Sequence, residues 1–200
     1  DDPAVTVTGG DDDITVDTFP PARPSGRPSD GVDATAANDA VPAGMELEFE
    51  SANFDLDENG DASASLVAPI GWSSRVFIGV QFEPEADADL GFFTRMKVDA
   101  GCDGLCEVTD WEERLTGPDG YLTMLDEGDN VVERRDVTGS AGVVRIVEDT
   151  FGTTVIVLRW DDSADHYFQC EAILDDGAQE LAEAFEAACL ASRPDWFEVG

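Results

Sequence analysis

An acidic stretch with the sequence FDLDENGDASASL (residues 54–66) has the spacing of a calcium-binding loop. Four oxygen-bearing side chains fall on ligand positions of an EF-hand register: Asp55, Asp57, Asn59 and Asp61. Such a loop also needs a carboxylate at its twelfth position and helices on both sides, whereas the twelfth residue is Leu66 and both flanks alternate like strands. The pattern therefore predicts a β-hairpin tip. Calcium binding is the alternative hypothesis, with the DDSAD segment (161–165) as a second acidic group.

The cysteines offer a choice between disulfide bonds and a metal site; they are Cys102, Cys106, Cys170 and Cys189. Cys170 shares a strand face with Phe168, and Cys189 lies on the apolar stripe of a predicted C-terminal helix. Both sulfurs are expected to point inward, which predicts a Cys170–Cys189 disulfide. A second disulfide is predicted within CDGLC (102–106). Zinc and free thiols are the alternatives, but structural zinc sites normally use CxxC pairs, which this chain lacks.

The sequence predicts no catalytic residue, no cofactor site and no metal ligand. A Ser–His–Asp set would depend on the single histidine, His166, and no Gly-x-Ser-x-Gly elbow supplies the serine. Ser140, in GSAG, lies in a predicted hairpin turn. Phosphate-loop and dinucleotide fingerprints are missing, and carboxylate pairs carry little weight among 45 acidic residues. We expect a non-enzymatic protein, with a hydrolase using His166 and Ser140 as the minor alternative.

The composition is strongly acidic. The 45 acidic residues outnumber 11 basic ones, and the formal charge of −34 would repel the phosphates of nucleic acids and of anionic lipids. Only one basic residue is a lysine, Lys97. Because the charge is spread along the chain, it indicates a solvated surface of the halotolerant type, and a cationic partner is the electrostatic expectation. No apolar run approaches the roughly 18 residues of a membrane span.

Two regions of different composition divide the chain. Residues 1–44 are rich in proline, glycine and acidic residues and poor in large apolar ones, which predicts a disordered stalk. Residues 45–200 are predicted to form one packed domain. The chain begins at Asp1 and its first methionine is Met45, so we interpret the natural start as removed. A lipid anchor upstream of Asp1 would fit a stalk.

Alternating apolar and polar residues predict a series of strands over 45–56, 62–72, 75–84, 91–100, 131–137, 142–149, 153–160 and 166–174. Short connectors between the last four predict an antiparallel meander. Helical spacing predicts two main helices, over 105–115 and 175–194, the second opened by a capping box of Asp176 and Gln179. Trp111 and Trp160 are expected in the core. The predicted fold class is α+β: a curved antiparallel sheet packed with two helices and stapled by disulfides.

The segment LVAPIGW (66–72), with Pro69, Gly71 and Trp72, resembles the opening of PsbP-like and Mog-type domains. Small secreted envelope lipoproteins show a similar order of elements, with cysteines on the last strand and the last helix. The resemblance covers roughly residues 45–192. It implies an α+β sandwich that acts as a binding or assembly factor, and it transfers no functional residue.

Together these observations predict an extracytoplasmic protein, because disulfides persist in oxidising compartments. We expect a surface-anchored, non-catalytic binding or assembly domain for a protein or a cell-envelope component. The alternative function is binding of a divalent cation such as calcium.

Overall fold

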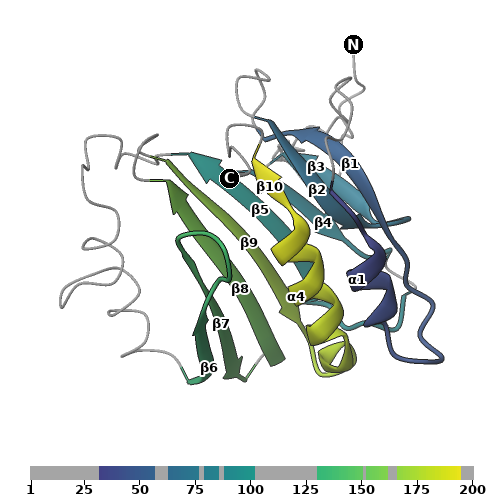
Figure 1. The fold of residues 1–200 in the computed structure, drawn as a ribbon. Coiled ribbons are helices and arrows are strands. Elements are labelled where there is room, and N and C mark those ends of the chain that lie inside the picture. Colours follow the sequence, from purple (N-terminus) through teal and green to yellow (C-terminus); the bar gives the residue numbers. More distant parts are fainter. Residues whose placement is uncertain are drawn as a thin grey trace, which may run out of the picture.

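The computed structural model describes residues 32–56, 63–76, 79–85, 88–101, 130–150, 152–161 and 166–194. The elements in chain order are α1 (Thr35–Asp39), β1 (Phe49–Asp55), β2 (Ser63–Pro69), β3 (Ser73–Val76), β4 (Val80–Glu83), β5 (Arg95–Gly101), β6 (Val131–Asp136), β7 (Gly142–Asp149), β8 (Gly152–Asp161), β9 (His166–Leu174), the 3₁₀ turn η1 (Gln179–Leu181), α4 (Ala182–Ala191) and β10 (Arg193–Pro194). Figure 1 shows their arrangement.

Two antiparallel sheets form the described part of the fold. The larger has seven strands in the order β3-β4-β5-β9-β8-β7-β6, and the smaller has the order β1-β2-β10. The predicted meander is confirmed, since β6 to β9 follow one another in the sheet. The predicted hairpin is confirmed as well, with Asp55 of β1 opposite Ser63 of β2. Antiparallel sheet thus dominates, as expected.

The prediction of two main helices is not matched by the described part of the chain. Only α4 is of substantial length, because α1 has five residues and the predicted helix over 105–115 lies outside the described residues. The strand predicted over 75–84 is also two strands, β3 and β4. Gly79 separates them with a φ of +91°, and a Cβ there would lie 2.2 Å from the carbonyl oxygen of Val98. Only glycine fits that position, and the chain reverses there.

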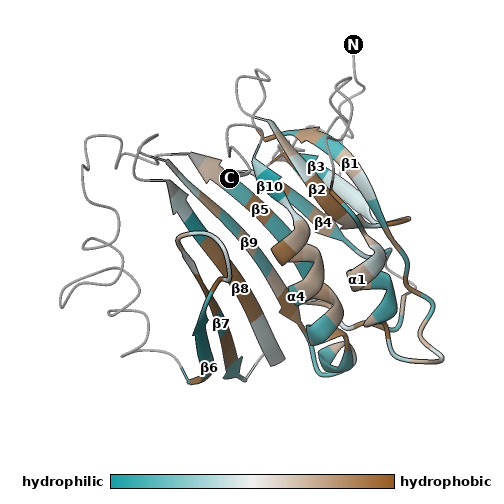
Figure 2. Cartoon of the chain, viewed as in Figure 1, coloured by the Kyte–Doolittle hydropathy of each residue, from teal (hydrophilic) through white to brown (hydrophobic). Residues whose placement is uncertain are grey.

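Strand alternation decides which face of the larger sheet is covered. In β9, Phe168, Cys170, Ala172 and Leu174 are buried, and the intervening side chains are half-exposed. Hydrophilic and hydrophobic residues alternate in the same way along β5 and β9 in Figure 2. The helix α4 crosses the covered face with a buried stripe of its own, and α1 lies beside it (Figure 1).

Phe185 joins α4 to both sheets. Its ring makes an edge contact with Phe49 of β1, with centroids 5.2 Å apart, and a tilted contact with Trp72 at 5.5 Å. Trp72 directly precedes β3 of the larger sheet. The helix is therefore packed where the two sheets meet, and the buried residues of both sheets form one main core cluster.

The disulfide between Cys170 and Cys189 is present, as predicted. It joins β9 to α4 with a Cα–Cα distance of 5.3 Å, and both residues are fully buried. Alternation in the strand and a 3.6-residue period in the helix each turned one sulfur inward, so two local patterns gave a long-range contact. Cys102 and Cys106 lie outside the described residues, and their pairing stays a prediction.

A second contact holds the carboxyl end of α4. The guanidinium of Arg159, on β8, donates hydrogen bonds to the carbonyl oxygens of Leu190 and Ser192, the latter over 3.1 Å. A cation at this end offsets the negative pole of the helix dipole and satisfies carbonyls that have no partner within the helix. Burial lowers the pKa of Arg159.

Ser192 extends this contact to the smaller sheet. Its hydroxyl donates to the carbonyl of Ala188 over 2.9 Å and accepts from the backbone N–H of Val67 in β2, also over 2.9 Å. One buried hydroxyl thus closes the last turn of α4 and joins it to β2. At the larger sheet's far edge, Arg135 of β6 forms ion pairs with Glu186 of α4 and with Glu133, and these contacts, the one with Glu186 foremost, raise the pKa of Arg135.

The beginning of α4 differs from the predicted capping box. The side-chain amide of Gln179 donates to the carboxylate of Asp176 over 3.1 Å, instead of reaching back to the backbone. The chain passes through η1 before α4 starts at Ala182, and Leu181 at the N-cap offers no capping side chain. The predicted helix was therefore correct in kind but too long at both ends, because α4 ends at Ala191 and Arg193–Pro194 form β10.

The packed fold begins before the predicted boundary at residue 45. Ala37 of α1 is buried in the main core, and the side chain of Asn38 pairs with the backbone of Phe49 in both directions, over 3.0 and 2.7 Å. Small residues gave this segment little apolar signal, so the sequence assigned it to the stalk of residues 1–44. Residues 1–31 lie outside the described residues.

Asp33 stabilises the start of α1. The backbone N–H and the hydroxyl of Thr35 donate to its carboxylate over 2.9 and 2.6 Å, and these bonds, the hydroxyl first, lower the pKa of Asp33. Because the folded-state pKa is the lower one, the contribution is present at neutral pH and is lost as the pH falls through that value.

We expect the Cys170→Ala/Cys189→Ala double variant to unfold with a free energy lower by about 2–5 kcal/mol, because the disulfide constrains the unfolded chain and fills buried space. Urea denaturation followed by tryptophan fluorescence measures this. The matched control is Cys102→Ala/Cys106→Ala, whose predicted pairing closes a much shorter loop and is expected to contribute less. Equal unfolding midpoints for the first variant and the wild type would contradict the assigned role.

We expect Asn38→Ala to lower the free energy of unfolding by about 1–2 kcal/mol, because it removes two hydrogen bonds to the backbone of Phe49. The control is Asp39→Ala, an exposed neighbour in the same helix without these bonds, which should change stability by less than about 0.5 kcal/mol. Hydrogen exchange of the Phe49 amide provides a local readout. Unchanged protection of that amide in Asn38→Ala would show that α1 is held by other contacts.

Candidate functional site

The face of the larger sheet opposite α4 carries the candidate site. We call the outward-pointing side chains of β3, β4, β5 and β9 the open face; its polar members are Ser73, Arg75, Gln81, Glu83, Arg95, Lys97, Asp99, Tyr167, Gln169 and Glu171. Almost all of them are partly or fully exposed, whereas their sequence neighbours in the same strands point into the core. A polar, half-exposed surface on a rigid sheet is suited to binding.

One row of side chains crosses the whole sheet on this side. Strand pairing places these residues successively opposite one another: Arg75, Gln81, Lys97, Glu171, Ile156, Arg145 and Arg134. Four of the seven are cations, in a chain where 45 acidic residues outnumber 11 basic ones. Positive charge is therefore concentrated on this row, against the composition of the chain, although one of the four cations, Arg145, is fully buried.

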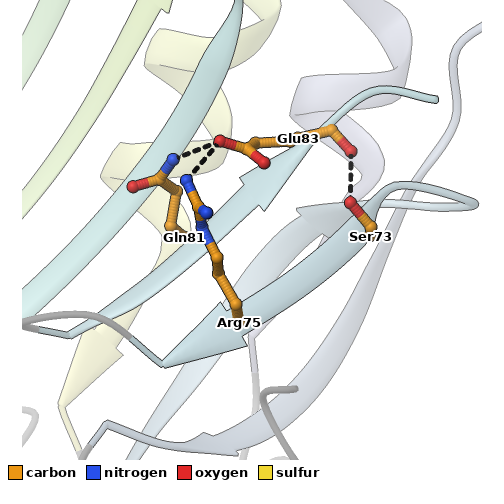
Figure 3. Close-up of polar contacts among 4 residues, drawn as sticks. All are labelled: Ser73, Arg75, Gln81 and Glu83. Atoms are coloured by element: carbon orange, nitrogen blue, oxygen red, sulfur yellow. Dashed lines mark hydrogen bonds and ion pairs between the residues drawn. The ribbon is translucent and has the colours of Figure 1, made fainter. Parts of the chain in front are cut away.

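A hydrogen-bonded cluster fixes one end of the open face, at β3 and β4 (Figure 3). One carboxylate oxygen of Glu83 accepts from Arg75 over 2.7 Å and from the amide of Gln81 over 2.6 Å. The Ser73 hydroxyl donates to the backbone carbonyl of Glu83 over 3.2 Å. The charge of Arg75 is thus matched by Glu83, and a half-exposed ion pair of this kind contributes little to stability.

Two further hydrogen bonds order the centre of the open face. The Tyr167 hydroxyl donates to Asp99 over 3.1 Å, and the Gln169 amide donates to Glu171 over 3.1 Å. Both carboxylates are therefore held by neutral donors.

Arg95 and Lys97 differ from the other charged members of the open face. Within the described ranges, no hydrogen bond or ion pair is found for either side chain. Lys97 stands directly opposite Glu171, yet that carboxylate is bonded to Gln169 and the two do not form an ion pair. Two adjacent cations on β5 are thus available to an incoming group.

The described side chains of the open face offer charge and hydrogen bonding. The backbone of His166 begins β9, opposite Asp161, and Ser140 lies in the turn between β6 and β7, as predicted. In the part of the chain that the structure describes, no group of His, Cys, Asp and Glu has the arrangement of a metal site. The alternative hypothesis of a hydrolase that uses His166 and Ser140 stays a prediction.

The structure describes both flanks of the segment that resembles a calcium-binding loop. Asp55 ends β1 and the buried Leu66 lies within β2, so both flanks are strands, as the hairpin prediction required, where an EF-hand would have helices. The other three oxygen-bearing residues of the register and residues 162–165 lie outside the described residues. Calcium binding therefore stays a prediction.

The tryptophans serve mostly as structural residues where they are described. Trp160 is buried in a small cluster with Val143 and Leu158, on the open-face side of β7 and β8, which confirms the predicted core position. Trp111 and Trp196 lie outside the described residues.

The sequence analysis did not predict the open face, although the sequence shows which side chains of each strand point outward. Alternation in RMKVDA and YFQCEAIL shows that Lys97 and Glu171 point away from the buried residues. It does not show that β5 pairs with β9, which follows about 70 residues later. The charged row exists only once that pairing is known.

Comparison of the chain with protein-family models, curated proteins and solved structures finds no match. The resemblance to PsbP-like and Mog-type domains therefore stays a prediction. Among the described residues, no helix is both long and apolar enough to cross a membrane.

We expect calcium titration by calorimetry to show only weak, salt-sensitive heat, because a chain with a charge of −34 attracts cations without a built site. The Asp55→Asn/Asp57→Asn variant should give the same titration as the wild type. A micromolar calcium signal that disappears in this variant would instead establish the alternative function.

Proposed function

We propose that this protein is a non-catalytic binding domain, working outside the cytoplasm, whose open face holds a protein or a component of the cell envelope. The observation that carries the proposal is the pair Arg95 and Lys97, two adjacent cations without a partner among the described residues. In so acidic a chain, two cations without a partner on an ordered face offer a binding site for anionic groups of another molecule.

The charges suggest what the partner presents. The overall charge of −34 attracts basic surfaces over long range and speeds encounter. At contact, the open face offers Arg95 and Lys97 between the carboxylates of Glu83, Asp99 and Glu171. A basic partner with carboxylates placed opposite these two cations fits both features, and alternating charges fix the register of binding.

The disulfide supports the proposed compartment. A buried Cys170–Cys189 bond is compatible with an oxidising environment outside the cytoplasm. The resemblance to PsbP-like and Mog-type domains supports a binding or assembly role. A stalk over the first residues and a lipid anchor upstream of Asp1 would hold the open face away from a membrane surface.

Because Lys97 is the only lysine of the chain, amine chemistry gives a specific test. A soluble amine-reactive acylating reagent is applied with and without the envelope fraction of the source cells, and mass spectrometry measures acylation of the Lys97 peptide. We expect slower acylation in the presence of the fraction, and restored acylation at high salt. Equal acylation with and without the fraction at low salt would contradict binding at the open face.

The same residue allows the partner to be trapped. An amine-reactive crosslinker should join Lys97 to a neighbour in the envelope fraction. Lys97→Arg is the matched control, because it keeps the charge and removes the amine. An Arg95→Glu/Lys97→Glu variant should lose the partner in a pull-down, whereas Lys97→Arg should retain it; retention by both variants would place the binding surface elsewhere.

A further inference from the structure

Two aromatic rings lie next to each other on the surface, where the other exposed large apolar side chains of the described residues, Ile70 and Val132, are aliphatic. Phe92 is 91% exposed and Phe93 is 41% exposed, and their rings meet edge to face with centroids 5.2 Å apart. The other phenylalanines among the described residues are buried in the core: Phe49, Phe54, Phe82, Phe168 and Phe185. We call Phe92 and Phe93 the aromatic tip.

The exposure of the aromatic tip is held by buried contacts on either side of it. The buried Thr94 donates a hydrogen bond through its hydroxyl to the carbonyl of Leu90 and accepts one from the backbone N–H of Asp175, over 3.1 Å. The backbone N–H of Phe93 donates to the carboxylate of Asp175 over 3.4 Å. These bonds clamp the loop to the segment that leads into α4.

Gly91 makes this clamp possible. Its φ is +82°, and a Cβ at this position would lie 2.5 Å from the Cβ of Asp175. The loop therefore lies directly against Asp175, and its conformation suits glycine. A loop ordered in this way loses little conformational freedom when its exposed rings are buried by a partner.

Three aspartates lie on or against the loop that carries the aromatic tip. Asp175 contacts its backbone, Asp176 is bonded to Asp175, and Asp89 lies beside Gly177 of the same segment, with its carbonyl 3.4 Å from the position of a Cβ there. The described residues of the two segments, 85, 88–94 and 175–181, include no lysine or arginine, and the nearest cation in the chain is Arg95, which begins β5 directly after Thr94. The surface is therefore an apolar centre with carboxylates on the side of the segment that leads into α4.

We propose that the aromatic tip is a docking element for a protein whose apolar pocket is rimmed by lysine and arginine. Charge complementarity selects this occupant, since a basic rim meets the carboxylates while the pocket takes the rings. An anionic lipid surface would be repelled, and so would a second copy of a chain that carries a charge of −34. Aromatic side chains, phenylalanine included, are also enriched in the cores of protein interfaces.

This surface adjoins the open face at Arg95, but its test is independent of Lys97. The probes are three labelled synthetic helical peptides: one with leucine and lysine faces, one with leucine and glutamate faces, and one with serine and lysine faces. Fluorescence anisotropy measures their binding. We expect the leucine–lysine peptide to bind the wild type best, and the Phe92→Ser/Phe93→Ser variant to bind it about tenfold to a hundredfold more weakly.

The controls separate apolar docking from general attraction to an acidic chain. Val132→Ser removes an apolar side chain that is 50% exposed on β6 and should bind like the wild type. Asp176→Asn should weaken binding and its dependence on salt. Because both rings are exposed, urea unfolding of the phenylalanine variant should match the wild type, which shows that any loss is local.

Two results would overturn the proposal. The first is equal binding of the leucine–lysine peptide to the wild type and to the phenylalanine variant, because charge alone would then account for it. The second is binding of the wild type, through its phenylalanines, to vesicles of zwitterionic phosphatidylcholine but not to the leucine–lysine peptide, which would make the aromatic tip a membrane contact. If the envelope fraction still slows the acylation of Lys97 when either result is obtained, the proposed function of the open face is unaffected.

Discussion

The joint between β9 and α4 is the contact on which the rest of the described structure depends. Cys170–Cys189 links the middle of β9 to the last turn of α4, and Arg159 of the neighbouring strand β8 holds the carboxyl end of the helix through its last carbonyls. The Ser192 hydroxyl then joins the end of the helix to the smaller sheet, because it bonds both to the carbonyl of Ala188 and to the backbone N–H of Val67. A helix of ten residues would be marginal alone, and tertiary contacts of this kind are what stabilise it.

The position of α4 also determines which surface is free for function. By covering one face of the seven-stranded sheet, the helix makes that side the core and leaves the opposite side of β3, β4, β5 and β9 to polar side chains. The pairing of β5 with β9 then puts Lys97 beside Glu171, and the pairing of β4 with β5 puts Gln81 beside Lys97. The charged row is a consequence of the register and not of any local motif.

Local patterns in the sequence predicted much of this fold. Period-two alternation gave β7 and β9 with their observed bounds, and two independent periods brought Cys170 and Cys189 together. The features that the sequence did not predict share a cause, because each depends on contacts between residues that are distant in the chain. The segment around Asn38 looked like a stalk because its apolar residues are small, and its order comes from hydrogen bonds to Phe49. The open face needed a strand pairing that no spacing in the sequence indicates.

Disulfide mapping of the unreduced protein by mass spectrometry tests the central joint most directly. After proteolysis at low pH without reductant, the structure predicts one peptide pair that contains Cys170 and Cys189, and that separates on reduction. Finding either cysteine as a free thiol, or linked to Cys102 or Cys106, would contradict it. The helix would then lack its covalent link to β9, and the assignment of a covered face and an open face would lose its basis.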